Sequence, residues 1–301
     1  MNEALVTKDL VKRYGRGNGL NGFTLSVVRG SILGLVGRNG AGKTTWMMSL
    51  VGFVRLHAGT VDLLGRGPFD AAVHSGRVSI LPQDSEPPLE ARPLELLVRY
   101  GRLQGLSSAE AKQSATELLT MLNLSDRLHS PIRTLSHGMR KRVMIAQAFL
   151  GHPELVLLDE PMSGLDPVEI DRMRNFILAR RGKQTIVISS HNLDDIERLC
   201  THVAFVDGGR VVRTSTVSQL THESGRVTYR LEISPDLSSL THEFPWIKAE
   251  WTEKKGELSV GFDLNAHSLA SANKELLPKL LSYGVLSVVP GQSLEEAFLS
   301  S

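Results

Sequence analysis

Residues 32–44 read ILGLVGRNGAGKT, in which five apolar residues lead directly into a glycine-rich turn. The turn fits a known phosphate-binding pattern: glycine, any four residues, glycine, lysine, and serine or threonine. That pattern requires a strand before it and a helix after it, and the sequence predicts both. The residues of the pattern are Gly37, Arg38, Asn39, Gly40, Ala41, Gly42, Lys43 and Thr44.

The residue types in this turn suit a bound phosphate chain. Glycine lets successive backbone N–H groups come close to phosphate oxygens. Lys43 supplies a point charge to the β and γ phosphates, and the Thr44 hydroxyl can ligate Mg²⁺. A helix that begins near Lys43 adds the positive end of its dipole. We therefore expect residues 37–44, together with Thr45, to bind a nucleotide.

A pair of acidic residues follows a second apolar run. Residues 155–158 read LVLL and are followed by Asp159 and Glu160. Such a strand delivers its carboxylates to the C-terminal edge of the sheet, where α/β folds bind ligands. Asp159 would then hold Mg²⁺ beside Thr44, usually through water. Glu160 would orient and polarise the water that attacks the γ phosphate.

The first two thirds of the chain predict an α/β core. Short apolar runs are typical of buried strands in a mostly parallel sheet, and they occur at residues 32–36, 78–81, 155–158, 186–188 and 203–206. Helices are predicted between the second and third of these runs, at residues 94–104, about 108–122 and 138–150. Ser107 and Glu110 form a capping box for the middle one. A helical subdomain at about 84–150 is therefore expected within a domain of residues 1–214.

The pattern changes after residue 214. Val227, Tyr229, Leu231 and Ile233 alternate with polar residues, as in a half-buried antiparallel strand. A helix at about 270–281 follows, then a short apolar run, then a last helix opened by Ser293 with Glu296 behind it. Residues 215–301 are thus predicted to form a small α+β domain, and they contain no motif that carries chemistry.

Composition narrows the class of protein. The 301 residues are 41% hydrophobic and 22% charged, with a net charge of +2 and the basic residues scattered along the chain, which argues against a dedicated nucleic-acid binder. Cys200 is the only cysteine, so no intramolecular disulfide is possible and a reducing compartment is expected. No apolar run approaches the ~20 residues of a membrane span. We expect any membrane crossing to be made by another polypeptide.

A third motif makes a family recognisable. Residues 135–139 read LSHGM, and Ser136 is placed to cap the helix that runs toward the acidic strand. This segment resembles the signature motif of ABC ATPases, usually written Leu-Ser-Gly-Gly-Gln. As in that family, it lies between the phosphate-binding turn of residues 37–44, called the P-loop, and the acidic pair Asp159 and Glu160. The resemblance covers residues 3 to about 213.

Other family elements follow in the expected order, and the resemblance implies their roles. Tyr14 lies where these proteins stack an aromatic ring on adenine. Gln83 resembles the glutamine that reaches Mg²⁺ and the attacking water and signals to the membrane partner. Asp166 ends the segment SGLD, which resembles the loop that crosses the dimer interface. His191 resembles the histidine that contacts the γ phosphate.

The resemblance implies a P-loop NTPase fold of the ABC type that binds ATP and Mg²⁺ and hydrolyses ATP. In the family the P-loop of one subunit holds ATP and the other subunit covers it, so Ser136 and Gly138 would act in trans. The implied partners are a second copy, or a related ATPase chain, and multi-span membrane permease subunits, with no nucleic acid. The implied location is cytoplasmic, peripheral on the inner face of the membrane. Residues 293–299 resemble the last helix of bacterial exporter-type subunits, which favours export.

Two departures and two alternatives complete the hypothesis. His137 replaces the first signature glycine and Met139 replaces the glutamine, but Ser136 and Gly138 are retained, so we expect hydrolysis to survive. One alternative is a soluble ABC ATPase that acts on nucleic acid or ribosomes. Such proteins usually carry two cassettes or a long coiled-coil insertion. The other alternative is a regulatory protein that binds ATP without hydrolysing it. Such a protein would be expected to lack Glu160 or His191.

Overall fold

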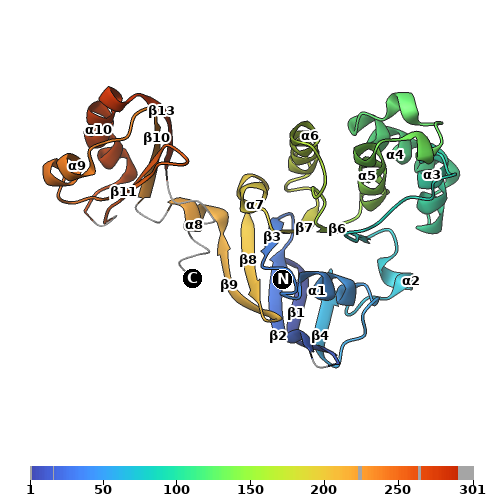
Figure 1. The fold of residues 1–301 in the computed structure, drawn as a ribbon. Coiled ribbons are helices and arrows are strands. Elements are labelled where there is room, and N and C mark those ends of the chain that lie inside the picture. The colour runs from blue at the N-terminus through green and yellow to red at the C-terminus, as the bar shows by residue number, and fades with distance from the viewer. Residues whose placement is uncertain (1, 16, 223–225, 264–265, 291–301) are drawn as a thin grey trace. The chain divides into compact units, whose positions relative to one another are not determined.

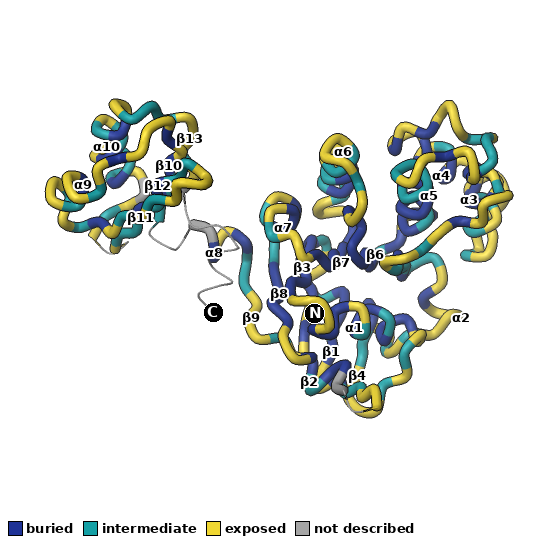
Figure 2. The backbone as a smooth tube through the Cα atoms, in the orientation of Figure 1, coloured by how far each residue is buried: buried dark blue, intermediate teal, exposed yellow. Residues whose placement is uncertain are grey.

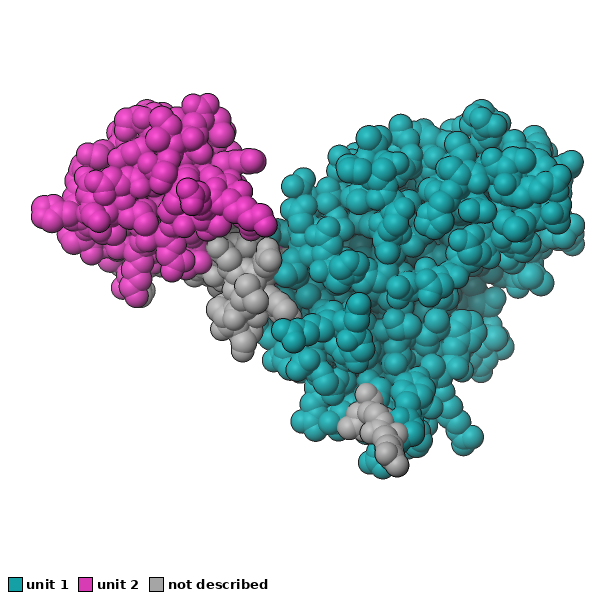
Figure 3. Space-filling view, viewed as in Figure 1, with its two compact units in different colours: residues 1–214 teal, residues 215–301 magenta. Residues whose placement is uncertain are grey.

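The computed structural model describes residues 2–15, 17–222, 226–263 and 266–290. The chain forms two compact units, residues 1–214 and residues 215–301 (Figure 3). Each unit has its own hydrophobic core.

The first unit is built on a six-stranded sheet with the strand order β5-β6-β7-β3-β8-β9 (Figure 1). In that order the strands are Val78–Leu81, Leu155–Asp159, Thr185–Ser190, Ile32–Val36, His202–Asp207 and Arg210–Thr216. The pairs β5–β6, β6–β7, β7–β3 and β3–β8 are all parallel. Every residue of β3, β6 and β7 is buried, as expected for strands covered on both faces (Figure 2). The five strands expected from the apolar runs are confirmed.

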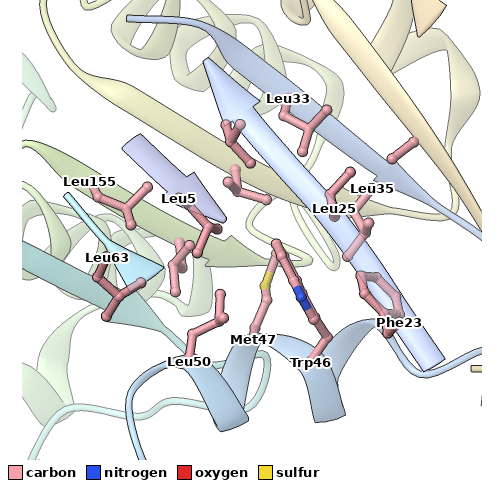
Figure 4. Packing of buried hydrophobic residues seen from close by; sticks show 14 of the residues in the cluster. Leu5, Phe23, Leu25, Leu33, Leu35, Trp46, Met47, Leu50, Leu63 and Leu155 are labelled. Atoms are coloured by element: carbon pink, nitrogen blue, oxygen red, sulfur yellow. The ribbon is translucent and has the colours of Figure 1, made fainter. Parts of the chain in front are cut away.

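A second, antiparallel sheet faces helix α1, Lys43–Leu50. Its order is β2-β1-β4, with bounds Gly17–Val28, Glu3–Tyr14 and Ala58–Leu63. Side chains from both sheets and from α1 form the main core, where Trp46 and Met47 lie among leucines (Figure 4). The Trp46 ring stacks on that of Phe23, with centroids 5.3 Å apart. This core fixes α1, and with it the end of the phosphate loop.

The helical subdomain leaves the sheet after β5 and returns to it at β6 (Figure 1). It contains α3, Pro93–Leu103; α4, Ser108–Met121; the short 3₁₀ helices Ser125–Arg127 and Ile132–Thr134; and α5, His137–Ala148, whereas the short α2, Ala71–His74, precedes β5. The capping box is confirmed, because Ser107 Oγ accepts from Glu110 N at 3.3 Å and Glu110 accepts from Ser107 N at 2.8 Å. Helices α6, Pro167–Leu178, and α7, Leu193–Leu199, follow β6 and β7.

The second unit begins with α8, Val217–His222, and continues with a β-α-β-β-α-β arrangement. Its elements are β10, Arg226–Leu231; α9, Leu237–Glu243; β11, Lys248–Thr252; β12, Glu257–Gly261; α10, Leu269–Leu280; the 3₁₀ helix Leu281–Tyr283; and β13, Val285–Pro290. The strands form one antiparallel sheet in the order β11-β12-β10-β13.

The strand predicted around Tyr229 is confirmed except at its end. Val227, Tyr229 and Leu231 enter the core of the second unit, whereas Ile233 lies beyond β10 and is 59% exposed. Including Ile233 was wrong, because pairing with β12 ends at Arg230 and the strand itself at Leu231. The apolar run after α10 is β13. The last predicted helix, at residues 293–299, lies outside the described residues.

Within the described part of the chain, no helix combines the length and the hydropathy needed to cross a membrane.

Candidate functional site

The carboxyl ends of the parallel strands share one pocket. Strands β3, β5, β6 and β7 point the same way, so the loops that follow them meet at one edge of the sheet. The residues that line this pocket are Asn39, Gly40, Ala41, Gly42, Lys43, Thr44, Thr45, Gln83, Asp159, Glu160, Ser163 and His191. Most of the predicted site residues are thus brought together.

The phosphate loop takes a conformation that depends on glycine. Gly42 has a φ of 109°, and a Cβ at this position would lie 2.6 Å from the Gly19 carbonyl oxygen. Helix α1 begins at Lys43, as the sequence predicts, and its first residues Lys43, Thr44 and Thr45 line the pocket, where the positive end of a helix dipole favours an anion. Any side chain at position 42 would therefore force the loop apart.

Lys43 is held inside the loop rather than extended into water. Its Nζ donates to the carbonyl oxygens of Gly37, at 2.6 Å, and Arg38, at 3.3 Å. Burial lowers the pKa of Lys43, and the nearby carboxylates of Glu160 and Asp159 oppose that shift. The side chain is only 7% exposed, so its positive charge acts in a poorly solvated setting. Such a charge interacts strongly with a phosphate anion.

One carboxylate oxygen of Asp159 has no hydrogen-bond partner among the residues that the structure describes. The Ser189 hydroxyl donates to Asp159 Oδ1, while Asp159 Oδ2 is buried and accepts no hydrogen bond from the described part of the chain. A buried carboxylate oxygen without a partner is costly unless a cation or donor reaches it. Thr44, which carries a hydroxyl, lines the same pocket. This donor set of carboxylate and hydroxyl oxygens fits Mg²⁺.

Glu160 is fixed at its backbone and at its side chain. It is not a glycine, yet its φ is 47°, a left-handed conformation that costs about 1–3 kcal/mol. Its N–H donates to Ser189 Oγ at 3.0 Å, and its carbonyl accepts from Ser163 N at 3.2 Å. His191 Nδ1 lies 2.9 Å from Glu160 Oε2. The carboxylate is therefore presented to the pocket with its position set by three neighbours.

The signature segment does not reach this pocket. Ser136 caps α5 as predicted, with its Oγ accepting from Met139 N at 3.2 Å. The segment packs instead on the loop after the acidic pair, where a Cβ on Gly164 would lie 3.2 Å from His137 Cε1. Asp166 caps α6 by accepting from Glu169 N at 2.9 Å. Ser136, Gly138 and Asp166 are all absent from the lining of their own chain's pocket.

Tyr14 also lies outside the lining, at the end of β1. It is 49% exposed and contacts the loop at Gly19, where a Cβ would lie 2.6 Å from the tyrosine ring and 3.2 Å from the Thr45 methyl group. The ring is therefore close to the start of α1. Its stacking on adenine stays a prediction. Gly37 and Arg38 contribute carbonyl oxygens to Lys43 rather than surface to the pocket.

Comparison with known proteins identifies the family. Residues 20–163 match the family model described as "ABC transporter". The Nod factor export ATP-binding protein I of Paraburkholderia xenovorans is 32% identical over 284 residues, which is 91% of each chain. The chain belongs to the ATP-binding subunits of ABC transporters.

Further matches support the assignment of this chain to the ABC ATPases. The daunorubicin resistance ATP-binding protein DrrA3 of Streptomyces coeruleorubidus is 33% identical and covers 74% of this chain and 71% of its own. A solved ATP-binding subunit of an ABC transporter is 31% identical, with a TM-score of 0.64 over 72% of this chain and 91% of its own. A second cassette, in its ADP conformation, is 23% identical with a TM-score of 0.64, and it supports the fold alone.

Sequence reasoning missed two residues that hold the acidic pair of this ABC ATPase. Ser189 bonds both Asp159 and Glu160 and is fully buried, and Lys141 donates to the Glu160 carbonyl oxygen at 3.1 Å. The signal for Ser189 was its place at the end of an apolar run, two residues before His191. For Lys141 the sequence offers no signal beyond its place in α5, the helix that begins in the signature segment.

Proposed function

We propose that two copies of this ABC ATPase enclose two ATP molecules and drive separate membrane subunits by closing and reopening. One observation carries the proposal. The pocket of a single chain brings the P-loop, Asp159, Glu160 and His191 together, but Ser136 and Gly138 lie outside it. One chain thus supplies one side of a nucleotide site, and a second chain supplies the other.

Within one pocket, the residues divide the work of phosphoryl transfer to water. Lys43 would leave the carbonyl oxygens of its own loop to bind the β and γ phosphates. The Thr44 hydroxyl, Gln83 and Asp159 would hold Mg²⁺, which supplies positive charge to the phosphate oxygens. The positioning of phosphates and water is the main source of catalysis in this reaction.

Glu160 would act on the water. Its carboxylate accepts a proton as the water oxygen bonds to the γ phosphorus, and the bond to the bridging oxygen of ADP breaks. His191, 2.9 Å from Glu160 Oε2, would orient that carboxylate and reach the γ phosphate. Ser189 keeps Asp159 and Glu160 in fixed relation by bonding both.

The second chain would cover the bound ATP on the side that faces away from the first chain's P-loop. Ser136 and the first N–H groups of α5 form the N-terminal end of a helix, which favours an anion. ATP would then bind the closed pair better than the open pair, because only the closed pair offers both sets of contacts. Cleavage of the γ phosphate removes contacts and lets the pair reopen. The second chain is a copy of this one or a related ATPase.

The names of the relatives support a proposal on the membrane partners and the direction of transport. The relatives' names refer to Nod factor export and to daunorubicin resistance. We infer that this chain also serves an exporter, peripherally on the cytoplasmic face of the membrane, with the permease on separate chains. A soluble role on nucleic acid or ribosomes is the alternative, and no observation favours it.

The test is affinity purification of the tagged chain from detergent-solubilised membranes of its own cell. The expected result is co-purification of a multi-span membrane protein, identified by mass spectrometry, and ATPase activity in the purified complex. The same tag on an unrelated soluble protein is the control. Recovery of an active ATPase with soluble partners only, such as ribosomal proteins, would contradict the transporter assignment.

A further inference from the structure

Lys141, on helix α5 of the helical subdomain, contacts the backbone of the turn that follows β6. Lys141 Nζ donates to the carbonyl oxygen of Glu160 at 3.1 Å and to that of Ser163 at 3.4 Å. We propose that Lys141 is a positioning residue for Glu160, which it holds by the backbone from the signature helix. This inference rests on the proposed role of Glu160 as the group that activates water.

The backbone of Glu160 needs external donors and acceptors to keep its conformation. Its φ of 47° turns the chain sharply as β6 ends, so Glu160 lies beyond the regular ladder of the sheet. Its carbonyl oxygen accepts from Ser163 N and from Lys141 Nζ. The first donor is local to the turn, whereas the second comes from a different subdomain. Lys141 is thus the contact that makes the direction of the carboxylate depend on α5.

The electrostatic surroundings of Lys141 agree with a fixed, charged contact. Four carboxylates act on it, those of Asp84, Glu160, Glu86 and Asp159, and their attraction opposes the lowering of the Lys141 pKa by burial. Asp84 and Glu86 follow Gln83 in sequence, while Asp159 is the last residue of β6 and Glu160 is the next. The ammonium group therefore lies between the loop that contains Gln83 and the acidic pair, where it also reduces repulsion between the two.

The place of Lys141 in the helix gives this contact a further consequence. Ser136 caps the same helix and lies five positions earlier, a little more than one turn away. If Ser136 covers the nucleotide of the opposite subunit, a shift of α5 moves Lys141 and hence the Glu160 backbone. The position of Glu160 in one ATP site thereby depends on whether nucleotide occupies the other ATP site.

The test compares ATP turnover of the full chain in three variants. Lys141→Met removes the ammonium and is expected to lower kcat about tenfold with KM for ATP within about twofold, since Glu160 is misaligned while the P-loop is intact. Lys141→Arg keeps charge and donors and is expected to restore kcat to within about threefold of the parent. Arg140→Met, the matched control, removes a cation near Glu86 that makes no bond to Glu160, and kcat should stay within about twofold.

A double-mutant cycle with Glu160→Gln separates positioning from general damage. Lys141→Met should not lower the residual single-turnover rate of Glu160→Gln further, because the group that it positions is already lost. A further loss by the same factor in that background, or an unchanged kcat in Lys141→Met, would overturn the proposal. Lys141→Leu, with the same expectation, replaces the methionine variant if thermal melting shows misfolding. A Glu160→Gln chain that turns over normally would instead refute the role of Glu160.

Discussion

Glu160→Gln is expected to lower kcat for ATP hydrolysis by a factor of about 100 or more while ATP still binds. The amide has the size of the carboxylate but cannot take a proton from the attacking water, and loss of a general base costs about 10²–10⁴ in rate. The amide oxygen can still face His191 Nδ1, which lies 2.9 Å from Glu160 Oε2 in the parent. The substitution therefore removes chemistry with little change in packing.

The same variant is expected to accumulate as an ATP-bound dimer. If ATP closes the pair and hydrolysis reopens it, a chain that binds but does not hydrolyse stays closed. Light scattering after size exclusion with ATP and Mg²⁺ measures this, with ADP as the reference. Glu117→Gln is the matched control, because Glu117 is exposed on α4 and bonds only to Gln113 in the described contacts. A Glu160→Gln chain that is monomeric with ATP, or that hydrolyses at the parental rate, would refute this role.

Lys43→Ala is expected to weaken ATP binding by about 10- to 150-fold, since a hydrogen bond to a charged group contributes about 1.5–3 kcal/mol. The lysine charge is desolvated in the loop, and alanine leaves the phosphates without it. Titration with a fluorescent ATP analogue gives the affinity, and adenosine should bind equally to both proteins. Lys112→Ala removes an exposed lysine of α4 and should bind ATP as the parent does. Parental affinity in Lys43→Ala would contradict the assignment of residues 37–44.

The strands that carry the site could be predicted because they are apolar on both faces. Residues 32–36 and 155–158 are short uninterrupted apolar runs, and each ends in residues whose chemistry is evident from their type. The antiparallel sheet was not predicted strand by strand. In β1, register shifts between Thr7 and Leu10 and between Lys12 and Arg13 break the alternation that marks a strand.

The parts of the site that escaped prediction depend on contacts between elements far apart in the chain. Ser189 meets Glu160 across 29 positions, and Lys141 meets it across 19. A serine or lysine has many ordinary places in a fold, so its residue type carries no signal until strand order and helix packing are known. Ile233 illustrates the opposite case, in which the alternating pattern continues past the residue where the strand ends.

The measurement that tests the shared site most directly mixes two inactive variants. Lys43→Ala disables the P-loop, and Gly138→Asp places a carboxylate where the partner's phosphates would lie. A Cβ on Gly138 would sit 3.7 Å from Leu165, an ordinary contact, so the second variant should fold. Each variant alone is expected to be inactive. Their equimolar mixture is expected to regain about a quarter of parental turnover, because half of the pairs contain one intact site of two. A mixture as inactive as its components would contradict an ATP site built from two chains.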